Sequence, residues 1–257
     1  MIRFLVRFVA FLMTVYAGLC IAMYLVQDSL IYYPVLTPHQ NDSNVEIFRL
    51  NGENIVVVCY RPNDQSNETD ALVYFGGNAE DVSASMWQLA KAFPQKSIYA
   101  MHYRGYGGST GQPRQSELFA DALALFDKIQ TKHKQIVVMG RSLGTGVATF
   151  LASQRSAQKL ILVTPYFSLE QVARDQYPFL PAKLLLRDKY ESYLYAPKVN
   201  APVLMVVAER DQLTPIQGSI ELQNRFRPGQ VKRVMIKQAW HNGISNHPEY
   251  LEVLRDF

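Results

Sequence analysis

The residue best suited to covalent chemistry is a serine framed by two glycines. Ser142 stands at the centre of Gly140-Arg141-Ser142-Leu143-Gly144, a G-x-S-x-G motif that follows the continuous apolar run Ile136–Met139. A strand that turns sharply into a helix at such a motif exposes the serine hydroxyl above a sheet, where it can act as a nucleophile. Glycine is expected at Gly140 and Gly144 because a side chain at either position would collide with the neighbouring strand or helix. The motif therefore predicts a nucleophile elbow.

A serine hydroxyl is a weak nucleophile until a base takes its proton and a carboxylate orients that base. Behind an elbow, the acid and the base follow the serine along the chain, on loops at the carboxyl ends of later strands. Glu209-Arg210-Asp211 follows the apolar segment Val203–Ala208, which predicts a strand. We expect Asp211 to be the orienting carboxylate, with Glu209 as its rival.

The base is expected on the next loop of the same kind. Trp240-His241-Asn242 follows the predicted strand Val231–Ile236, which places His241 where the topology requires a base. His247, which directly precedes Pro248, is the competing histidine. Ser142, Asp211 and His241 thus form the predicted catalytic triad.

The negative oxygen that forms when a serine attacks a carbonyl group needs preorganised amide donors. The amide of Leu143, directly after the nucleophile, is the first candidate. The second is the amide of Asn78, in the turn Gly76-Gly77-Asn78-Ala79 that follows the apolar segment Leu72–Phe75. The same glycines would also suit a turn that has no catalytic role.

Alternating strands and helices are predicted around these residues. The buried strands lack a polar face, which is typical of a mostly parallel sheet covered by helices on both faces. Asn51-Gly52 is expected to join the first two strands into a hairpin, which adds an antiparallel edge. The clearest helix runs over Ser116–Gln130, with Ser116 as a candidate N-cap. The predicted strands are Val45–Leu50, Ile55–Tyr60, Leu72–Phe75, Ile98–Tyr103, Ile136–Met139, Leu160–Val163, Val203–Ala208 and Val231–Ile236, and the other predicted helices are Ala79–Phe93, Leu143–Arg155, Ile216–Arg227 and Ser245–Phe257.

The first part of the chain predicts a membrane anchor over residues 1–27. Phe8–Val26 are nineteen consecutive residues without a charge. That length is close to the ~20 residues that a helix needs to cross ~30 Å of hydrocarbon. Arg3 and Arg7 precede the run and Asp28 follows it, which favours a cytoplasmic amino terminus and a domain outside the cytoplasm.

Two alternatives compete with the anchor: a cleaved signal peptide and a buried core helix. A signal peptide would have an apolar region of ~7–15 residues followed by a small-residue cleavage site. The best match to such a site, Cys20–Ala22, lies inside the run instead of after it. With an anchor, residues 28–44 form a stalk, and Tyr24, Tyr32 and Tyr33 are placed for an interfacial aromatic belt. The domain is then periplasmic if the source is a Gram-negative bacterium.

The domain predicted over residues 45–257 carries a cap-like insertion at about 165–199. This stretch is rich in aromatic residues and broken by prolines, and it lies between the strand Leu160–Val163 and the strand that leads to the acid. One interpretation is that Tyr177–Leu186 lines an apolar acyl pocket that faces the bilayer. The other is ordinary packing of a small helical excursion over the sheet.

Composition excludes several classes of protein. With 48% hydrophobic residues and a net charge of +4, the chain is too apolar and too weakly charged for intrinsic disorder. Its basic residues are scattered, so no nucleic-acid partner is expected. The two cysteines, without ligand spacing, predict neither a disulfide scaffold nor a metal site. The glycine-rich segment Tyr103–Gly111 lacks a nucleotide-binding motif, so no cofactor is expected, and we expect this segment to border the mouth of the pocket.

The chain resembles an α/β-hydrolase of the membrane-anchored abhydrolase group, related to the serine aminopeptidase-like hydrolases. The resemblance implies the α/β-hydrolase fold, with Ser142 as nucleophile, Asp211 as orienting acid and His241 as base. Members usually have His-Gly-Asn where this chain has Gly76-Gly77-Asn78, so the support of this turn is expected to differ. The resemblance covers nearly everything from Asp28 onward and is carried by Tyr32–Pro34, the Gly-Asn-Ala turn, Tyr103–Gly111, the elbow, the Asp211 turn and His241-Asn242.

Together these features predict a membrane-anchored serine hydrolase that cleaves carboxylic ester or thioester bonds through an acyl-enzyme intermediate. Its expected partners are a small-molecule or lipid-like acyl substrate and the membrane that holds its N-terminal helix. Two alternatives fit the same sequence. One is an aminopeptidase-like or amidase activity on the same triad, and the other is a hydrolase-like membrane scaffold without turnover, against which an intact triad argues.

Overall fold

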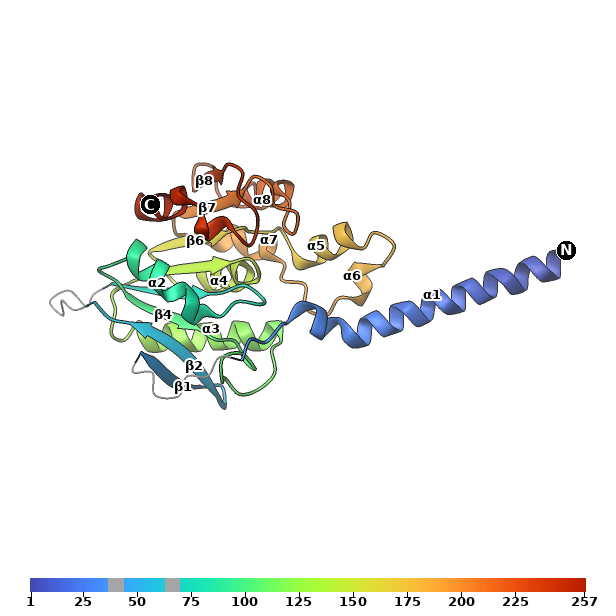
Figure 1. The fold of residues 1–257 in the computed structure, drawn as a ribbon, viewed down its shortest axis with the longest axis horizontal. Helices are drawn as coiled ribbons and strands as arrows, with labels where there is room; N and C mark the ends of the chain where they lie inside the picture. The colour runs from blue at the N-terminus through green and yellow to red at the C-terminus, as the bar shows by residue number, and fades with distance from the viewer. Residues whose placement is uncertain (37–43, 63–69) are drawn as a thin grey trace.

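The computed structural model of the chain describes residues 1–36, 44–62 and 70–257 (Figure 1). A mixed sheet forms the centre of the body, helices cover both of its faces, and one long helix, α1 (Ile2–Ile31), projects away from it. Residues 37–43, which belong to the predicted stalk, lie outside the described residues.

The sheet has eight strands in the order β1-β2-β4-β3-β5-β6-β7-β8. β1 and β2 form the antiparallel hairpin predicted at Asn51-Gly52, where the φ angles are 48° and 86°. β2 also pairs antiparallel with β4, and the later pairings are parallel, so the predicted mostly parallel sheet with an antiparallel edge is confirmed. The strands are β1 (Val45–Leu50), β2 (Glu53–Tyr60), β3 (Asp70–Phe75), β4 (Ser97–Met101), β5 (Gln135–Arg141), β6 (Lys159–Val163), β7 (Val203–Ala208) and β8 (Val231–Ile236).

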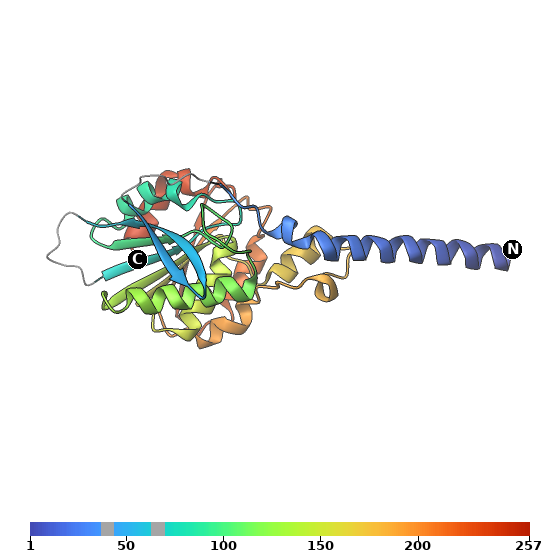
Figure 2. The same cartoon turned by 90° about the horizontal axis from the view of Figure 1, so that it is seen from below.

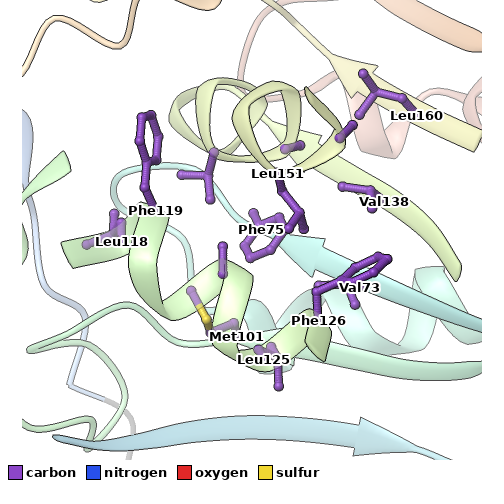
Figure 3. Close-up of a cluster of buried hydrophobic side chains, with 14 of the residues drawn as sticks. Val73, Phe75, Met101, Leu118, Phe119, Leu125, Phe126, Val138, Leu151 and Leu160 are labelled. Carbon is purple, nitrogen blue, oxygen red and sulfur yellow. The ribbon is translucent and has the colours of Figure 1, made fainter. Parts of the chain in front are cut away.

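The sheet separates two hydrophobic cores because successive strand residues point to opposite faces. In β3, Val73 and Phe75 pack in the core beneath α3 and α4, which Figure 3 shows, whereas Leu72 and Tyr74 pack beneath α2 and α9. This double burial explains why the central strands lack a polar face, whereas the edge strands β1 and β8 carry exposed charged residues. The covering helices are α2 (Val82–Ala92), α3 (Gln115–Ile129), α4 (Leu143–Gln154), α8 (Ile216–Gln223) and α9 (Pro248–Arg255).

Three helices begin at residues other than those predicted. α2 begins at Val82 instead of Ala79, directly after its N-cap residue Asp81. α3 begins directly after Arg114, the N-cap residue, so Ser116 lies inside the first turn and its predicted capping role is wrong. α9 begins only at Pro248, because residues 244–246 form a short 3-10 turn. Proline suits this first helical position, since its ring presets the helical φ angle and the missing N–H would have no partner within the helix.

The insertion between β6 and β7 divides into two parts. Its second part, α7 (Ser192–Tyr195) with the 3-10 turn Ala196–Lys198, packs into the core, where Tyr190 and Val199 are fully buried. Its first part, α5 (Leu169–Gln176) and α6 (Ala182–Leu185), projects from the body beside the base of α1, as both views show (Figures 1 and 2). We call residues 169–187 the cap hairpin.

The helix α1 continues beyond its apolar run and ends in a buried joint. It extends past Asp28 to Ile31, and both Ile31 and Tyr32 are buried in the body. The Tyr32 hydroxyl donates a hydrogen bond to Asp188 at 2.7 Å and lies 2.9 Å from the Tyr190 hydroxyl. Tyr32 thus belongs to the domain, and the prediction that it joins an interfacial aromatic belt is wrong. The chain therefore leaves α1 through this buried joint.

Within the described part of the chain, α1 alone is long and apolar enough to cross a membrane, with a mean hydropathy of 2.2 over its most apolar window. None of that window is buried against the body, which excludes the alternative of a buried core helix. The predicted N-terminal helix is therefore present, and it is a candidate membrane span.

Candidate active site

Ser142 stands at a sharp turn between β5 and α4. Its φ of 48° and ψ of −119° lie outside the regions that non-glycine residues favour, which is the strained geometry of a nucleophile elbow. A Cβ atom at Gly140 would stand 2.2 Å from the Gly144 carbonyl oxygen, and one at Gly144 would stand 2.1 Å from the Phe75 oxygen. The predicted reason for both glycines is confirmed.

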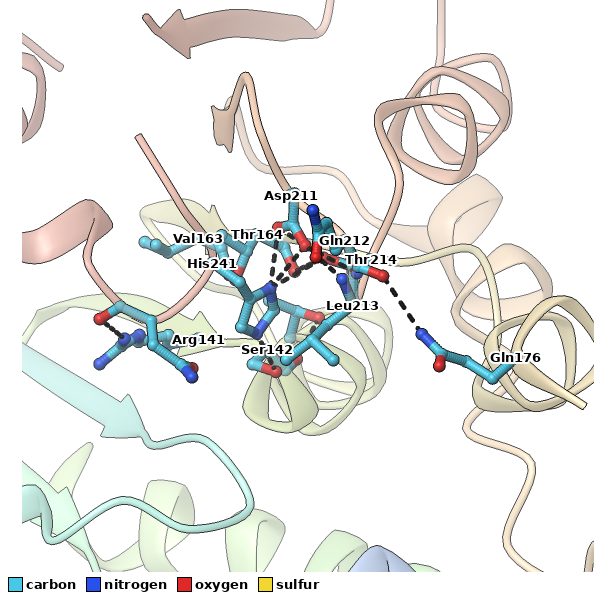
Figure 4. Close-up of polar contacts among 12 residues, drawn as sticks. Arg141, Ser142, Val163, Thr164, Gln176, Asp211, Gln212, Leu213, Thr214 and His241 are labelled. Atoms are coloured by element: carbon cyan, nitrogen blue, oxygen red, sulfur yellow. Dashed lines mark hydrogen bonds and ion pairs between the residues drawn. The ribbon is translucent and has the colours of Figure 1, made fainter. Parts of the chain in front are cut away.

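His241 brings the other two residues of the predicted triad together (Figure 4). Its Nε2 atom lies 2.8 Å from the Ser142 hydroxyl, and its Nδ1 atom lies 2.8 Å and 3.0 Å from the two carboxylate oxygens of Asp211. Only 7% of the His241 surface is exposed, so the imidazole is held by protein on most sides. This arrangement allows a proton to move from Ser142 to Nε2 while Nδ1–H donates to Asp211.

The Asp211 carboxylate is oriented by its own turn. It accepts hydrogen bonds from the backbone amides of Leu213 at 3.0 Å and Thr214 at 2.8 Å, and the Thr214 hydroxyl donates to its second oxygen at 2.9 Å. The Thr214 hydroxyl oxygen also lies 3.2 Å from Nδ1 of His241. Thr214 was not singled out in the sequence, although the spacing Asp-x-x-Thr after a strand is typical of a turn closed by side-chain hydrogen bonds.

The two rival residues face elsewhere. Glu209 accepts a hydrogen bond from the Gln238 amide at 2.7 Å, which ties β7 to the segment after β8. His247 is the residue that precedes α9, and its amide donates to the Ile244 carbonyl at 3.2 Å. The geometry thus brings Asp211 and His241 to Ser142 and does not bring their competitors there.

Both predicted oxyanion donors line the same cavity as Ser142. Leu143 is the first residue of α4, and amides in a first helical turn have no partner within the helix. The Asn78 carbonyl accepts hydrogen bonds from the Tyr106 hydroxyl at 2.6 Å and from the Tyr33 amide at 3.2 Å, and the Asn78 side chain donates to the Ile31 carbonyl at 3.2 Å. These bonds fix the position of Asn78, whose backbone amide stays the candidate donor for an oxyanion.

Glu80 supports the turn in which Asn78 lies. Its carboxylate accepts hydrogen bonds from the Gly77 amide at 2.8 Å and from the Tyr74 hydroxyl at 2.6 Å, and it lies 3.5 Å from the Arg141 guanidinium. At Gly76, where the family usually has histidine, a Cβ atom would stand only 2.7 Å from Val82. The packing therefore excludes a side chain at Gly76, and Glu80, which the sequence analysis missed, holds the turn instead.

The glycine-rich segment Tyr103–Gly111 also supports this turn. Tyr103 donates to the Gly76 carbonyl at 2.7 Å, and Tyr106 donates to Asn78 as described above. Burial raises the pKa of both phenols, so they remain protonated donors at neutral pH. Neither residue lines the cavity, so the prediction that this segment borders the pocket mouth is wrong.

A cavity of about 850 Å³ extends from Ser142 and His241 to the base of α1. The cap hairpin supplies much of its apolar wall, and α1 contributes Met23, Leu30 and Ile31. The predicted lining Tyr177–Leu186 is only half correct, because its side chains alternate between two faces. The inward ones are Tyr177, Leu180, Ala182, Leu185 and Leu186, whereas Phe179 and Leu184 are outside the cavity and are 60% and 82% exposed.

One polar contact ties the cap hairpin to the acid turn. The Gln176 side chain of α5 donates to the Gln212 carbonyl at 3.2 Å, next to Asp211 in the chain (Figure 4). On the opposite side, the Arg141 guanidinium donates to the Asn242 carbonyl at 2.9 Å. The loops of the acid and of the base are thus each fastened to a neighbouring element of the site.

The chemistry available at this site is that of its side chains. Among the residues that the structure describes, no group of three or more His, Cys, Asp or Glu side chains is placed to hold a metal ion. Cys59 and Cys20 are both free thiols. Burial raises the pKa of the Cys59 thiol to about 12, which keeps it protonated and unreactive at neutral pH. Ser142 is therefore the candidate nucleophile in the cavity.

Comparison with known proteins agrees with this geometry. A family model described as serine aminopeptidase, S33, matches residues 67–194. An uncharacterised protein of Mycobacterium tuberculosis is 33% identical over 222 residues, which are 80% of this chain and 78% of that protein. The alpha/beta hydrolase domain-containing protein aho-3 of Caenorhabditis elegans is 28% identical over 232 residues, 86% of this chain and 68% of that protein. Among solved structures, Est1E from Butyrivibrio proteoclasticus matches with a TM-score of 0.68 at 14% identity and covers 84% of this chain and 97% of its own.

Proposed function

The chain belongs to the α/β-hydrolase superfamily, as its motifs predicted, and we propose that it is a serine hydrolase that cleaves carboxylic ester or thioester bonds through an acyl-enzyme intermediate. The observation that carries the proposal is the continuous chain of short contacts from Ser142 through His241 to Asp211. A serine, a base and an orienting acid in this geometry are what acyl transfer requires.

In the first half of the proposed reaction, His241 Nε2 takes the proton of Ser142 as the serine oxygen attacks the carbonyl carbon. The amides of Leu143 and Asn78 receive the negative charge that develops on the carbonyl oxygen. When the tetrahedral intermediate collapses, the bond to the leaving alcohol or thiol breaks and His241 returns the proton to it. Ser142 then carries the acyl group as an ester.

In the second half, a water molecule repeats the attack. His241 removes a proton from the water, the oxygen attacks the acyl carbon, and the same two amides hold the oxyanion. Collapse of this intermediate releases the carboxylic acid, and His241 returns the proton to Ser142. Throughout, Asp211 holds the imidazole in the tautomer that leaves Nε2 free to accept and stabilises the positive charge that forms on it.

The walls of the cavity support an apolar acyl group as the part of the substrate that is bound. Cavity-lining side chains such as Leu180, Leu185 and Leu186 offer no polar partner, and each CH₂ group removed from water by such a wall is worth ~0.8 kcal/mol. The two carboxylates in the wall, Glu80 and Asp81, already accept hydrogen bonds from the Gly77 and Ser83 amides. A peptidase that recognises a free α-amino group would need an acidic partner for it, so these contacts favour an ester or thioester over an aminopeptidase substrate.

We further propose that α1 spans a membrane with the domain on the non-cytoplasmic side. Arg3 and Arg7 flank the amino end of the apolar run, and clusters of basic residues are retained on the cytoplasmic side. Protease added to intact cells or spheroplasts should digest the domain. Complete protection, together with digestion after lysis, would reverse the proposed topology.

The chemistry is tested with an active-site-directed fluorophosphonate probe on the full-length protein in detergent. Wild type should be labelled, Ser142→Ala should not, and His247→Ala should be labelled like wild type. A panel of p-nitrophenyl esters, thioesters and aminoacyl anilides then separates the substrate classes. Faster turnover of anilides than of esters would establish the amidase alternative, and a folded wild-type protein that resists labelling would establish the scaffold.

A further inference from the structure

The tip of the cap hairpin presents apolar side chains to the outside of the protein. Phe179 and Leu184 are 60% and 82% exposed, although Leu180 and Leu185 beside them are turned into the cavity. Charged residues gather at the two ends of this tip, with Arg174 and Asp175 before it and Arg187 and Asp188 after it, and Lys183 is the one charge between them. Exposed apolar side chains bounded by charges are typical of a surface that contacts lipid.

The hairpin lies alongside α1 instead of standing in open solvent. The Tyr16 hydroxyl of α1 donates to the Phe179 carbonyl at 2.8 Å. Nearer the body, the Gln27 side chain donates to the Leu185 carbonyl at 3.1 Å and accepts from the Arg187 amide at 2.8 Å. Tyr16 and Gln27 are eleven residues apart, so the two contacts lie about 16 Å apart along the helix.

A cluster of charges marks the level at which α1 leaves the body. Asp28 pairs with Arg187 at 2.9 Å and also with Arg114, and the Arg187 guanidinium stacks over the Tyr24 ring at 5.0 Å. A paired acid with two arginines is stable in the polar layer of a membrane and costly in its hydrocarbon. The water-facing end of the span is therefore near Asp28.

From this level the depth of the hairpin tip follows. A span placed between Arg7 and Asp28 puts Tyr16 about 18 Å inside the hydrocarbon boundary on the domain side, at 1.5 Å per residue. A span moved to the extreme amino end of α1, over residues 1–20, still leaves Tyr16 about 6 Å inside that boundary. Phe179, which is bonded to Tyr16, shares its depth in either position. The bond also satisfies the Tyr16 hydroxyl, which hydrocarbon could not do.

We propose that the tip of the cap hairpin, residues 177–184, is a second membrane-inserted element: Phe179, at the depth of Tyr16, packs against the acyl chains of the bilayer beside α1, whereas Lys183 and Leu184, which adjoin Leu185 at the level of Gln27, lie at the membrane interface, where a lysine side chain can reach the polar layer. Its inner face lines the cavity that ends at Ser142, and α1 closes the same cavity on the other side. The substrate then reaches Ser142 laterally from the membrane as the acyl chain of a lipid-like amphiphile. The insertion rests on the proposed membrane span of α1, and the substrate class rests on the proposed hydrolase activity.

The insertion is tested by the depth of single spin labels in the full-length protein. Cys20 and Cys59 are first replaced by alanine, and one cysteine is then introduced by Phe179→Cys and labelled in phosphatidylcholine vesicles. Two matched variants are Leu12→Cys, inside the span, and Ile47→Cys, an equally exposed apolar residue at the far edge of the sheet (68% exposed). Accessibility to oxygen, which dissolves in the bilayer, is compared with accessibility to a water-soluble nickel chelate.

The label at position 179 should resemble that at position 12, with a ratio of oxygen to nickel accessibility at least tenfold above that at position 47. A label at 179 that is as nickel-accessible as the label at 47 would overturn the proposal. A label shielded from both quenchers would also overturn it, because a protein surface or a second copy of the chain would then cover the tip. If the label at position 12 meets nickel, the span itself is wrong and the insertion is refuted with it.

The lateral delivery of the substrate has its own readout. Leu184→Asp places a charge on the outer face without altering the cavity wall, and Ile47→Asp is the matched control. Hydrolysis of a long-chain ester embedded in vesicles should fall at least tenfold in Leu184→Asp, while labelling by a soluble fluorophosphonate stays at the wild-type rate. Equal loss of both readouts, or loss of neither, would refute delivery from the bilayer. Absence of labelling in wild type would refute the hydrolase activity and leave the depth measurements unaffected.

Discussion

The triad loops and the cap hairpin occupy opposite sides of one cavity but are held in different ways. Ser142, Asp211 and His241 follow β5, β7 and β8, whose backbones are locked in one sheet by parallel pairing. The cap hairpin pairs with no strand and is joined to α1 and to the acid turn by separate side-chain contacts, such as those of Tyr16, Gln27 and Gln176. The comparison indicates that the catalytic groups are fixed by strand register, whereas access to them depends on individual side-chain contacts.

The largest loss of activity should follow substitutions in the triad, which the sheet holds in place. Ser142→Ala and His241→Ala should each reduce kcat by about 10⁴- to 10⁶-fold, because each removes a group without which the proton transfer and the attack cannot occur. The midpoint of thermal unfolding should change little, since neither side chain carries a core contact. Steady-state kinetics on a p-nitrophenyl ester, with circular-dichroism melting curves, measure both.

Within this experiment, Asp211→Asn should lose somewhat less activity than Ser142→Ala, and Glu209→Gln should lose almost none. His247→Ala serves as the control for the base. If His247→Ala were inactive and His241→Ala active, the assignment of the base would be wrong, and with it the view that strand register alone places the triad.

A smaller effect is expected at the support of the oxyanion turn. Glu80→Gln weakens the acceptor that holds the Gly77 amide, so the Asn78 amide next to it should lose its fixed direction. Complete loss of one oxyanion donor raises the activation barrier by ~2.7–4 kcal/mol. A donor that is only misdirected should therefore reduce kcat by less, about 10- to 100-fold. KM should stay nearly unchanged, since the donors act on the transition state.

The conservative replacement at another acidic residue separates this role from simple destabilisation. Glu117 lies on α3, away from the cavity, and its carboxylate pairs with Arg104. Glu117→Gln should therefore leave kcat and KM unaltered. If Glu80→Gln raised KM and left kcat intact, Glu80 would belong to substrate binding and not to the positioning of the turn.

The next effect is expected in the cap hairpin, where a substitution should change how kcat/KM depends on the length of the acyl chain. In wild type, each added CH₂ of the acyl chain should raise kcat/KM about fourfold until the cavity is full, because its burial contributes ~0.8 kcal/mol. Leu185→Asn puts a polar group in the cavity wall and should flatten this dependence. A chain-length series in detergent measures it.

Leu184→Asn is the matched control, since the neighbouring leucine points out of the cavity and its replacement should leave the slope unchanged in detergent. A flat profile in wild type would refute the acyl pocket and move the proposal toward small esters or peptides. Equal loss with every ester in Leu185→Asn, together with a lower melting temperature, would indicate that the hairpin only packs over the sheet.

The smallest effect is expected at the joint of α1. Tyr32→Phe removes the hydroxyl that donates to Asp188, and the loss of one buried hydrogen bond to a carboxylate should destabilise the fold by about 1–3 kcal/mol. Burial, with the nearby charge of Asp188, raises the pKa of Tyr32, so this donor stays protonated and the effect should not vary between pH 6 and 9. Urea unfolding of the protein in detergent measures the change.

Tyr33→Phe, at a half-exposed neighbour, should change the free energy of unfolding by much less. A larger loss in Tyr33→Phe than in Tyr32→Phe would show that the joint is held by other contacts. It would also weaken the contrast between the sheet, which is fixed by strand pairing, and the cap hairpin, which is held by separate side-chain contacts.

The sequence allowed the triad to be predicted because the positions of Ser142, Asp211 and His241 depend on local features. Each follows a predicted strand, and the order along the chain assigns the roles. The paired glycines Gly140 and Gly144 could also be explained in advance, since only the close approach of helix and strand requires them. The structure brings these three side chains into contact, and their catalytic roles stay a prediction.

Other features could not be predicted because they depend on tertiary packing. Nothing in the local pattern shows that Glu80 folds back onto the Gly77 amide, or that Tyr103 and Tyr106 support the turn instead of lining the pocket. The aromatic composition of the insertion and its place in the chain suggested Tyr177–Leu186 as a pocket wall but could not tell which of its side chains meet the cavity. Tyr32 was assigned to a membrane interface for the same reason: its buried partner, Asp188, lies far along the chain.

The contacts between α1 and the cap hairpin bear on how the protein is assembled in the cell. Their hydrogen bonds link Tyr16 to Phe179 and Gln27 to Leu185, residues that are 163 and 158 positions apart in the chain. Because α1 is synthesised before the cap hairpin, it must wait for the intervening chain before it meets these partners, and contacts of such separation close late. Once synthesised, and until these contacts close, Phe179 and Leu184 are exposed sites for aggregation, and a bilayer that holds α1 would give them an apolar surface on which to settle.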